Sequence, residues 1–255
     1  MPTDPTHEMP AAPEWPREFE LCCETLQACE AAAAGGADRI ELCTALDVGG
    51  VTPPLSVLRA ALELTTLPIH VLIRPRGGGF QYTAAEFSLL LQQVEDAVHH
   101  GASGVVTGVL DEDMRVDLER MRDVMHAANG KPITFHRAFD LTPDLPVALE
   151  EIIGLGCARV LTSGGAADVI SGLAMLQKLT AQAAGRIRVA AGGGVRVANA
   201  ALLLETPGLD LHASLRTFDG TEPSHPLEGE FGSGYVVRMK DVRAITDLVH
   251  NGDAR

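Results

Sequence analysis

The sequence lacks a long apolar run and has few aromatic residues. Of its 255 residues, 46% are hydrophobic but only 4% are aromatic. No apolar run approaches the roughly 20 residues that a membrane span requires. The N-terminus has neither a basic start nor an apolar signal core. We therefore expect a soluble, unexported protein with no membrane partner.

Cysteine and positive charge are also scarce. The five cysteines are an odd number without framework spacing, and the paired CxxC units of a four-thiolate zinc site are absent. Reduced thiols in a cytoplasmic protein are therefore expected in place of structural disulfides. The formal net charge of −14 repels a phosphate backbone, which argues against nucleic acid as a partner.

The chain does contain a regular alternation of short apolar runs and longer runs of helical periodicity. The apolar runs start about 27 residues apart, which is the length of one βα unit. Eight such units predict an α/β fold, a single-domain (β/α)8 TIM barrel over residues 17–255. An open doubly wound sheet is disfavoured because no Gly-x-Gly-x-x-Gly turn follows the first strand. The predicted strands are 19–23, 39–43, 69–74, 104–109, 132–137, 159–163, 187–191 and 209–214.

Two segments, 1–16 and 218–234, lie outside this alternating pattern. Residues 1–16 are rich in proline and are expected to form a flexible tail, from which Trp15 could still dock. Segment 218–234 is polar and follows the last strand, so it could form a lid, reach a neighbouring subunit or be disordered. Helix starts are predicted at Thr52-Pro53, at Thr142-Pro143 and at a capping box from Thr83 to Glu86.

In several predicted strands the polar residues stand at every second position, so they point to the same face of the strand. Because a parallel barrel buries both faces of each strand, a polar residue there needs a reason. We expect Glu20, Glu41 and His70 to form a lower layer on the barrel axis, where mutual pairing without function is an equal alternative. The C-terminal ends of the strands form the functional face. The whole axial column is Glu20, Glu41, His70, Arg74, His136 and His212, and the mouth should carry Cys22, Cys43, Arg74, Arg76, His136, Arg137, Asp140, Ser163 and Ser214.

Two glycine-rich loops follow predicted strands at this face. RPRGGGF presents Arg74 and Arg76 after the third strand, and AAGGGVR presents Gly193 and Gly194 after the seventh. Guanidinium groups and free backbone amides bind anions, and Ser214 lies nearby on the eighth strand. Tight turns that need positive φ are the alternative reading. The loops predict a small anionic ligand.

Two cysteines end adjacent predicted strands at similar heights. Cys22 and Cys43 should therefore lie about 5 Å apart across the ladder. Two thiolates at that separation can bind Cu(I) in two-coordinate geometry. The alternative is that both are small buried hydrophobic residues. Cys23, of opposite parity, should face the helices.

Motifs in consecutive order resemble the CutC family of copper homeostasis proteins. They include FELCCE, GGADRIELC, IRPRGGGFQYT, ITFHRAFD, CARVLTSGG and AGGGVR. The resemblance implies a (β/α)8 barrel, a cytosolic location, a homo-oligomer and a Cu(I) site at Cys22 and Cys43. Gly79 stands where the family pattern usually has aspartate, and the eighth strand reads His212-Ala213-Ser214 where the pattern has His-Ser-Ser or His-Cys-Ser.

Two functions of different classes follow. The first is a copper homeostasis protein that binds Cu(I) at Cys22 and Cys43. The second is an enzyme acting on a small phosphorylated or carboxylated metabolite. In the enzyme, Arg74 and Arg76 would clamp the anion and His136 would act as general acid or base. Glu20 or Glu41 would tune that histidine.

Overall fold

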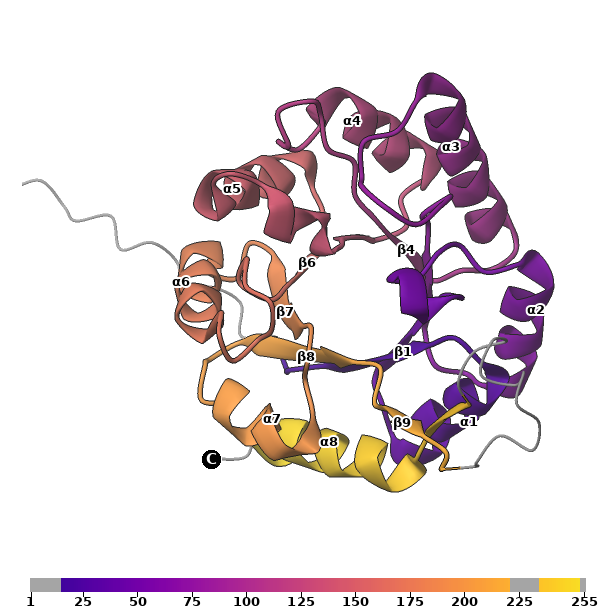
Figure 1. Ribbon diagram of the computed structural model, residues 1–255, viewed down its shortest axis with the longest axis vertical. Helices are drawn as coiled ribbons and strands as arrows, with labels where there is room; N and C mark the ends of the chain where they lie inside the picture. The colour runs from indigo at the N-terminus through magenta and orange to yellow at the C-terminus, as the bar shows by residue number, and fades with distance from the viewer. Residues whose placement is uncertain (1–14, 221–233, 253–255) are drawn as a thin grey trace, which may run out of the picture.

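The computed structural model describes residues 15–220 and 234–252, and eight parallel strands pair in chain order and close into a barrel, β8 beside β1. The strands surround the centre and the helices form the outer ring (Figure 1). The predicted (β/α)8 barrel is confirmed. The strands of the barrel are β1 (Phe19–Cys23), β2 (Arg39–Leu42), β3 (Ile69–Leu72), β4 (Gly104–Thr107), β5 (Ile133–Phe135), β6 (Arg159–Thr162), β7 (Arg188–Gly192) and β8 (Leu209–Ala213).

Helices follow the strands in alternation, and two short 3-10 helices precede α2 and α5. The last helix, α8, packs beside α1 and completes the ring (Figure 1). The helices are α1 (Leu26–Gly35), η1 (Leu46–Val48), α2 (Leu55–Leu64), α3 (Ala84–His99), α4 (Leu118–Ala127), η2 (Arg137–Leu141), α5 (Leu145–Leu155), α6 (Leu173–Ala183), α7 (Val197–Leu203) and α8 (Met239–Gly252).

Strand β1 shows how alternation sorts side chains between the helices and the barrel axis. All five of its residues are buried. Leu21 and Cys23 join the main apolar core with Cys29 of α1, whereas Cys22 belongs to a separate small cluster inside the barrel. Cys23 therefore faces the helices, as predicted, and Cys22 faces the axis together with Glu20.

Six of the eight strands end one or two residues earlier than predicted, and β3, β4 and β5 each end two residues earlier. Strand β3 ends at Leu72 and β5 at Phe135, so Arg74 and His136 lie in the loops that follow. His136 is the N-cap of η2. These side chains belong to the loop face of the barrel, where position is set by local hydrogen bonds.

The capping predictions had mixed outcomes. Thr83 and Glu86 form the predicted capping box of α3. Helix α2, however, starts at Leu55 without a side-chain cap. Thr52 instead accepts a hydrogen bond from the Arg74 backbone N–H at 2.8 Å and donates to Gln93. Its hydroxyl thus anchors the loop after β3. Helix α5 is capped by Asp144 and not by Thr142.

The two segments outside the barrel pattern are described only in part. Residues 1–14 of the predicted tail and 221–233 of the predicted lid lie outside the described residues. The Trp15 ring lies 5.5 Å from the guanidinium of Arg188, which also donates to the Pro16 carbonyl. The strands β9 (Arg216–Phe218) and β10 (Tyr235–Val237) form an antiparallel pair that the sequence pattern did not predict.

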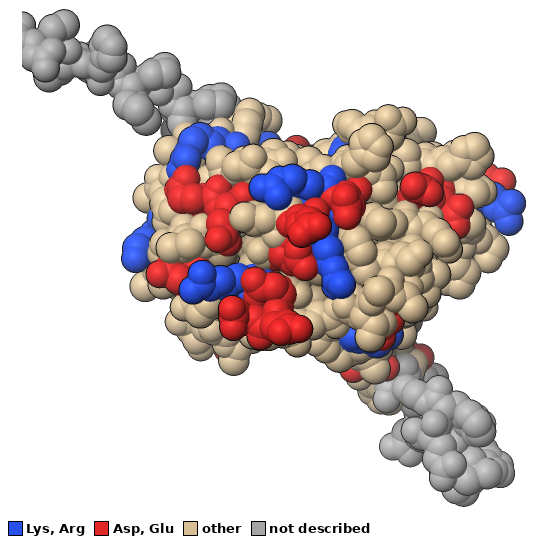
Figure 2. All heavy atoms as spheres, turned by 90° about the horizontal axis from the view of Figure 1, so that it is seen from above, with Lys and Arg blue, Asp and Glu red and all other residues tan. Residues whose placement is uncertain are grey.

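The surface carries charge of both signs. Lys and Arg lie among Asp and Glu across the face seen in Figure 2, and neither sign forms a continuous stripe there. Across the described residues, no helix is long and apolar enough to cross a membrane.

The closure of the helical ring at α1 and α8 can be tested with glycine substitutions. A Cβ on Gly35 would lie 2.4 Å from Cγ1 of Val242 in α8, whereas a Cβ on Gly154 in α5 would meet nothing within 4 Å. Gly35→Ala should therefore lower the unfolding free energy by about 1–3 kcal/mol. Gly154→Ala should raise it by roughly 0.5–1 kcal/mol. Urea unfolding of both variants measures this, and equal effects would contradict the packing.

Candidate metal and ligand site at the barrel mouth

A cavity of about 280 Å³ lies at the C-terminal ends of the barrel strands. Thiol, carboxylate and imidazole groups line it together with several arginines. Its walls come from seven of the eight strand ends and from the segment around η1. The lining residues are Cys22, Glu41, Leu46, Gly49, Leu72, Arg74, Phe80, His136, Arg137, Leu161, Gly193, Gly194, Val195, Arg196, His212, Ala213, Ser214 and Arg216.

The two predicted ligand thiols are in contact. The Sγ atoms of Cys22 and Cys43 are 3.6 Å apart and both residues are buried. The register differs from the prediction, because Cys22 pairs with Glu41 and not with Cys43. Strand stagger sets Cys22 level with Glu41, and Cys43 follows two residues later, just beyond the end of β2. The sulfurs meet because both side chains point to the axis from adjacent strands.

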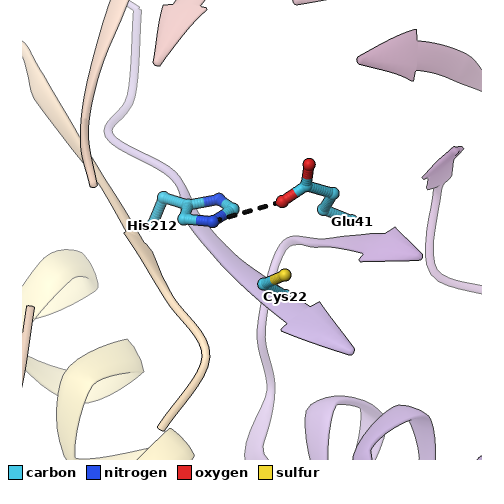
Figure 3. Close-up of side chains that lie close together, drawn as sticks. All are labelled: Cys22, Glu41 and His212. Atoms are coloured by element: carbon cyan, nitrogen blue, oxygen red, sulfur yellow. Dashed lines mark ion pairs between the residues drawn. The ribbon is translucent and has the colours of Figure 1, made fainter. Parts of the chain in front are cut away.

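His212 joins this thiol pair to two glutamates. Its Nδ1 lies 2.8 Å from Oε1 of Glu20, and its Nε2 lies 3.2 Å from Oε2 of Glu41. A sulfur, a carboxylate oxygen and a ring nitrogen from Cys22, Glu41 and His212 all lie within 4.8 Å of one another. The imidazole points toward Glu41 with the thiol beside both (Figure 3). This is the one group of potential metal ligands found among the described residues.

Charges around the imidazole shift the pKa values of all three partners. Burial alone would lower the pKa of His212, but Glu41, Cys22 and Glu20 outweigh it and raise that pKa well above 6.5. Burial also opposes ionisation of Glu20, yet Arg39 and then His212 hold its pKa well below the usual range. Burial raises the pKa of Glu41, and His212 offsets only part of this effect. His212 is therefore held as an imidazolium between Glu20 and Glu41.

The thiols are protonated at neutral pH when no metal is bound. The hydrogen bond with Cys43 and burial raise the pKa of Cys22 well above 9.0. The contact with Cys22 favours the Cys43 thiolate, but burial and Glu41 outweigh it and raise the pKa of Cys43. A metal that binds here must displace protons.

Below the cavity, buried ion pairs hold Glu20 in place. Arg39 pairs with Glu20 at 2.5 Å and with Glu18 at 2.9 Å. Arg159, the largest fully buried side chain, pairs with Glu18 and with Asp210, the latter at 2.7 Å. Ion pairing of this kind is what the structural alternative expects of Glu20, although Nη2 of Arg39 and two nitrogens of Arg159 have no hydrogen-bond partner among the described residues.

His70, the remaining member of the lower layer, pairs in register with Glu41 but does not belong to the metal-ligand group. Its ring is buried, and a Cβ on Gly104 would lie within 2.6 Å of it. Burial and then Arg39 lower the pKa of His70 to about 4. The ring is therefore neutral and fills the barrel interior.

The predicted anion-binding residues are only partly brought together. Arg74, Gly193, Gly194 and Ser214 line the cavity. Arg76 does not line it: this guanidinium pairs with Glu86 at 2.5 Å and donates to loop carbonyls. Glycines after Arg76 let its side chain fold back onto its own loop.

Several lining residues were missed or underweighted by sequence reasoning. Arg196 and Arg216 line the cavity but follow strands β7 and β8 by a few residues, beyond the strand ends that the parity argument covered. Arg137 was expected at the mouth. His212 was expected on the axis, but it was not assigned as a ligand. The available signal was that His212 and Glu20, on neighbouring strands, both point to the barrel axis.

The fold and this site define a class of protein: a (β/α)8 barrel with a group of potential metal ligands, Cys22, Glu41 and His212, near the C-terminal ends of its strands. The CutC family model matches residues 17–217. The chain belongs to the CutC family.

Individual relatives agree with this assignment. The family protein CutC of Pasteurella multocida is 41% identical over 77% of this chain and 81% of the relative. That of Bacteroides thetaiotaomicron is 45% identical over 78% and 81%. A solved CutC structure from Streptococcus agalactiae, to which a copper homeostasis role is ascribed, is 30% identical with a TM-score of 0.74, over 78% of this chain and 98% of that chain.

More distant structures share the barrel alone. A thiamine phosphate pyrophosphorylase from Pyrococcus furiosus is 16% identical with a TM-score of 0.57, over 93% of this chain and 96% of that chain. At this identity the likeness concerns the fold and not the chemistry.

The raised pKa of His212 can be tested by removing one of its carboxylate partners. Glu20→Gln should lower that pKa because the charge opposite Nδ1 is lost. Imidazole NMR signals followed against pH measure it in the metal-free protein. Glu86→Gln, which alters the ion pair of Arg76, is the matched control and should leave His212 unchanged. A His212 imidazole that titrates near 6.5 in the wild type would contradict its stabilisation as an imidazolium between Glu20 and Glu41.

Proposed function

We propose that the protein binds Cu(I) at Cys22 and Cys43 and acts in copper homeostasis. The observation that carries this proposal is the 3.6 Å contact between two axis-facing sulfurs beside an imidazole. Thiolates are the protein ligands that favour soft Cu(I) over hard cations. The family membership supports the same function.

The geometry favours a third donor over the two-coordinate site expected from the sequence. Two collinear metal–sulfur bonds of about 2.3 Å each would hold the sulfurs roughly 4.6 Å apart, which exceeds the observed 3.6 Å. A bent pair of thiolates leaves one side of the metal open. His212 lies on the cavity within reach of Cys22, and it would complete the site in its neutral form.

A reducing location belongs to the same proposal. All five cysteines are free and buried, which supports the expected cytosolic location because thiols persist there. A homo-oligomer stays a prediction from the family resemblance.

The second candidate function is catalysis on a small anionic metabolite. It is favoured by the size of the cavity and by the four arginines that line it, Arg74, Arg137, Arg196 and Arg216. In this candidate Arg74 binds the anion. The glutamates that were expected to tune His136 pair instead with His212, so Glu20 and Glu41 would set the protonation of His212. Burial, followed by Arg74, lowers the pKa of His136 to about 3, so this imidazole would act as a neutral donor rather than as an imidazolium acid.

Copper binding is tested by titrating the reduced protein with Cu(I) against a chromogenic chelator. The wild type should bind about one ion per site, and Cys22→Ser/Cys43→Ser should weaken binding by more than about a hundredfold. His212→Gln should weaken it by a smaller factor.

The matched control is Cys157→Ser. Cys157 is also buried, but it precedes β6 and belongs to the main apolar core. This variant should bind as the wild type does. Unchanged affinity in the double variant would overturn the proposed copper site.

The raised thiol pKa values predict that Cu(I) affinity depends on pH. Below those pKa values each thiol must release a proton when the metal binds. The apparent affinity should therefore rise about tenfold per pH unit between pH 6 and 8 for each proton released, with one or two protons from the thiols and one more from the His212 imidazolium if it joins the site. The same titration at several pH values measures the slope, and a pH-independent affinity would exclude the protonated thiols.

A further inference from the structure

The cavity has a second side with different chemistry from the thiol site. Cys22, Glu41 and His212 come from β1, β2 and β8, whereas Arg74, His136 and Arg196 follow β3, β5 and β7. The groups of the second side are cations and N–H donors, and copper binding uses none of them.

Arg74 is a buried cation without an anion. It is 5% exposed, and its Nη atoms donate to the carbonyls of Val48, Gly50 and Gly78. Its Nε has no acceptor, and no carboxylate in the described part of the chain pairs with it. A guanidinium stays charged in proteins, so burying it without a counter-charge is unfavourable. An acidic ligand in the cavity would supply that charge.

His136 offers an unused donor on the same side. The Ala138 backbone N–H donates to its Nδ1 at 3.3 Å, so the proton of the neutral ring is on Nε2. That Nε2 is buried and has no acceptor among the described residues. The His136 ring lies 4.6 Å from Phe80, whose face receives the Arg74 cation at 4.9 Å. Phe80 thus links the two unsatisfied groups.

The neighbouring loops differ in whether their amides are free. After β6, the Asp140 carboxylate accepts hydrogen bonds from the backbone N–H groups of Ser163 and Gly165. That loop therefore carries its own anion. After β7, the N–H groups of Gly193 and Gly194 have no acceptor among the described residues. The amides of Gly193 and Gly194 therefore remain available as donors.

Two more arginines border these free amides. A Cβ on Gly193 would lie 2.9 Å from Nη1 of Arg137, and this Nη1 makes no hydrogen bond within the described residues. Arg196 is exposed and donates to the Val195 carbonyl; no carboxylate of the described chain pairs with it. This cationic rim stands out in a chain of net charge −14.

We propose that this side of the cavity binds a small organic anion, a carboxylate or a phosphate monoester, whose acidic oxygens face the free N–H groups of Gly193 and Gly194 and the guanidinium of Arg196, next to Arg74 and His136. The cavity of about 280 Å³ has the volume of about nine water molecules. That space suits a metabolite and exceeds the need of one metal ion. The proposal goes beyond copper binding and does not depend on it.

The test is thermal unfolding of the metal-free protein with defined probes. Inorganic phosphate, glycerol 3-phosphate and malate are compared with sodium chloride at equal ionic strength and with glycerol as the neutral analogue. At least one organic anion should raise the melting temperature with a saturable concentration dependence. A response to malate alone assigns a carboxylate ligand, and a response to glycerol 3-phosphate alone assigns a phosphate ligand.

Variants then locate the bound anion by calorimetric titration. His136→Phe keeps an aromatic ring but removes the donor, and it should weaken binding about tenfold or more. Arg196→Gln should also weaken binding, and it decides the question if His136→Phe does not fold, because Arg196 is exposed. Arg186→Gln is the control. Arg186 precedes β7 at the opposite end of the barrel and pairs with Glu150, so its loss should leave affinity unchanged.

Copper and anion binding are separated by the thiol variant. Cys22→Ser/Cys43→Ser should lose Cu(I) but retain the anion response. The proposal is overturned if no organic anion stabilises the wild type beyond sodium chloride. It is equally overturned if folded His136→Phe and Arg196→Gln both bind with wild-type affinity.

Discussion

A buried chain of ion pairs along the barrel axis determines where the site can form. Arg159 holds Glu18, Glu18 holds Arg39, Arg39 holds Glu20, and Glu20 orients His212. Each link is buried or partly buried, so loss of one partner would remove part of the charge compensation of the next group. The imidazole at the end of this chain is therefore fixed in orientation before any ligand arrives. The ion pairs of the lower barrel therefore stabilise the fold, and through Glu20 they also orient the imidazole of His212 in the cavity.

Much of this arrangement could be predicted from the sequence because strand parity is a strong constraint. Parity placed Glu20, Cys22 and His212 on the axis and Cys23 against the helices. It could not give the stagger that pairs Cys22 with Glu41, since relative strand height depends on barrel closure. The sequence likewise predicted arginines at the mouth of the barrel. It could not show that Arg76 pairs with Glu86 and with carbonyls of its own loop, and therefore does not line the cavity.

The two sides of the cavity separate soft from hard ligand chemistry. Sulfur and imidazole lie together on β1, β8 and the end of β2, whereas guanidinium groups and backbone amides follow β3, β5 and β7. Thiolates select Cu(I), and cationic N–H donors select oxyanions. A barrel with both sides open to one space can hold a metal and an organic acid next to each other.

The central claim is that His212, oriented by Glu20, completes a copper site with Cys22 and Cys43. X-ray absorption spectroscopy of the Cu(I)-loaded protein tests it most directly, because it reports the number and type of atoms bound to the metal. The account predicts two sulfur ligands and one nitrogen ligand around a three-coordinate ion. A spectrum with no sulfur ligand, or with two collinear sulfurs and no nitrogen, would contradict it.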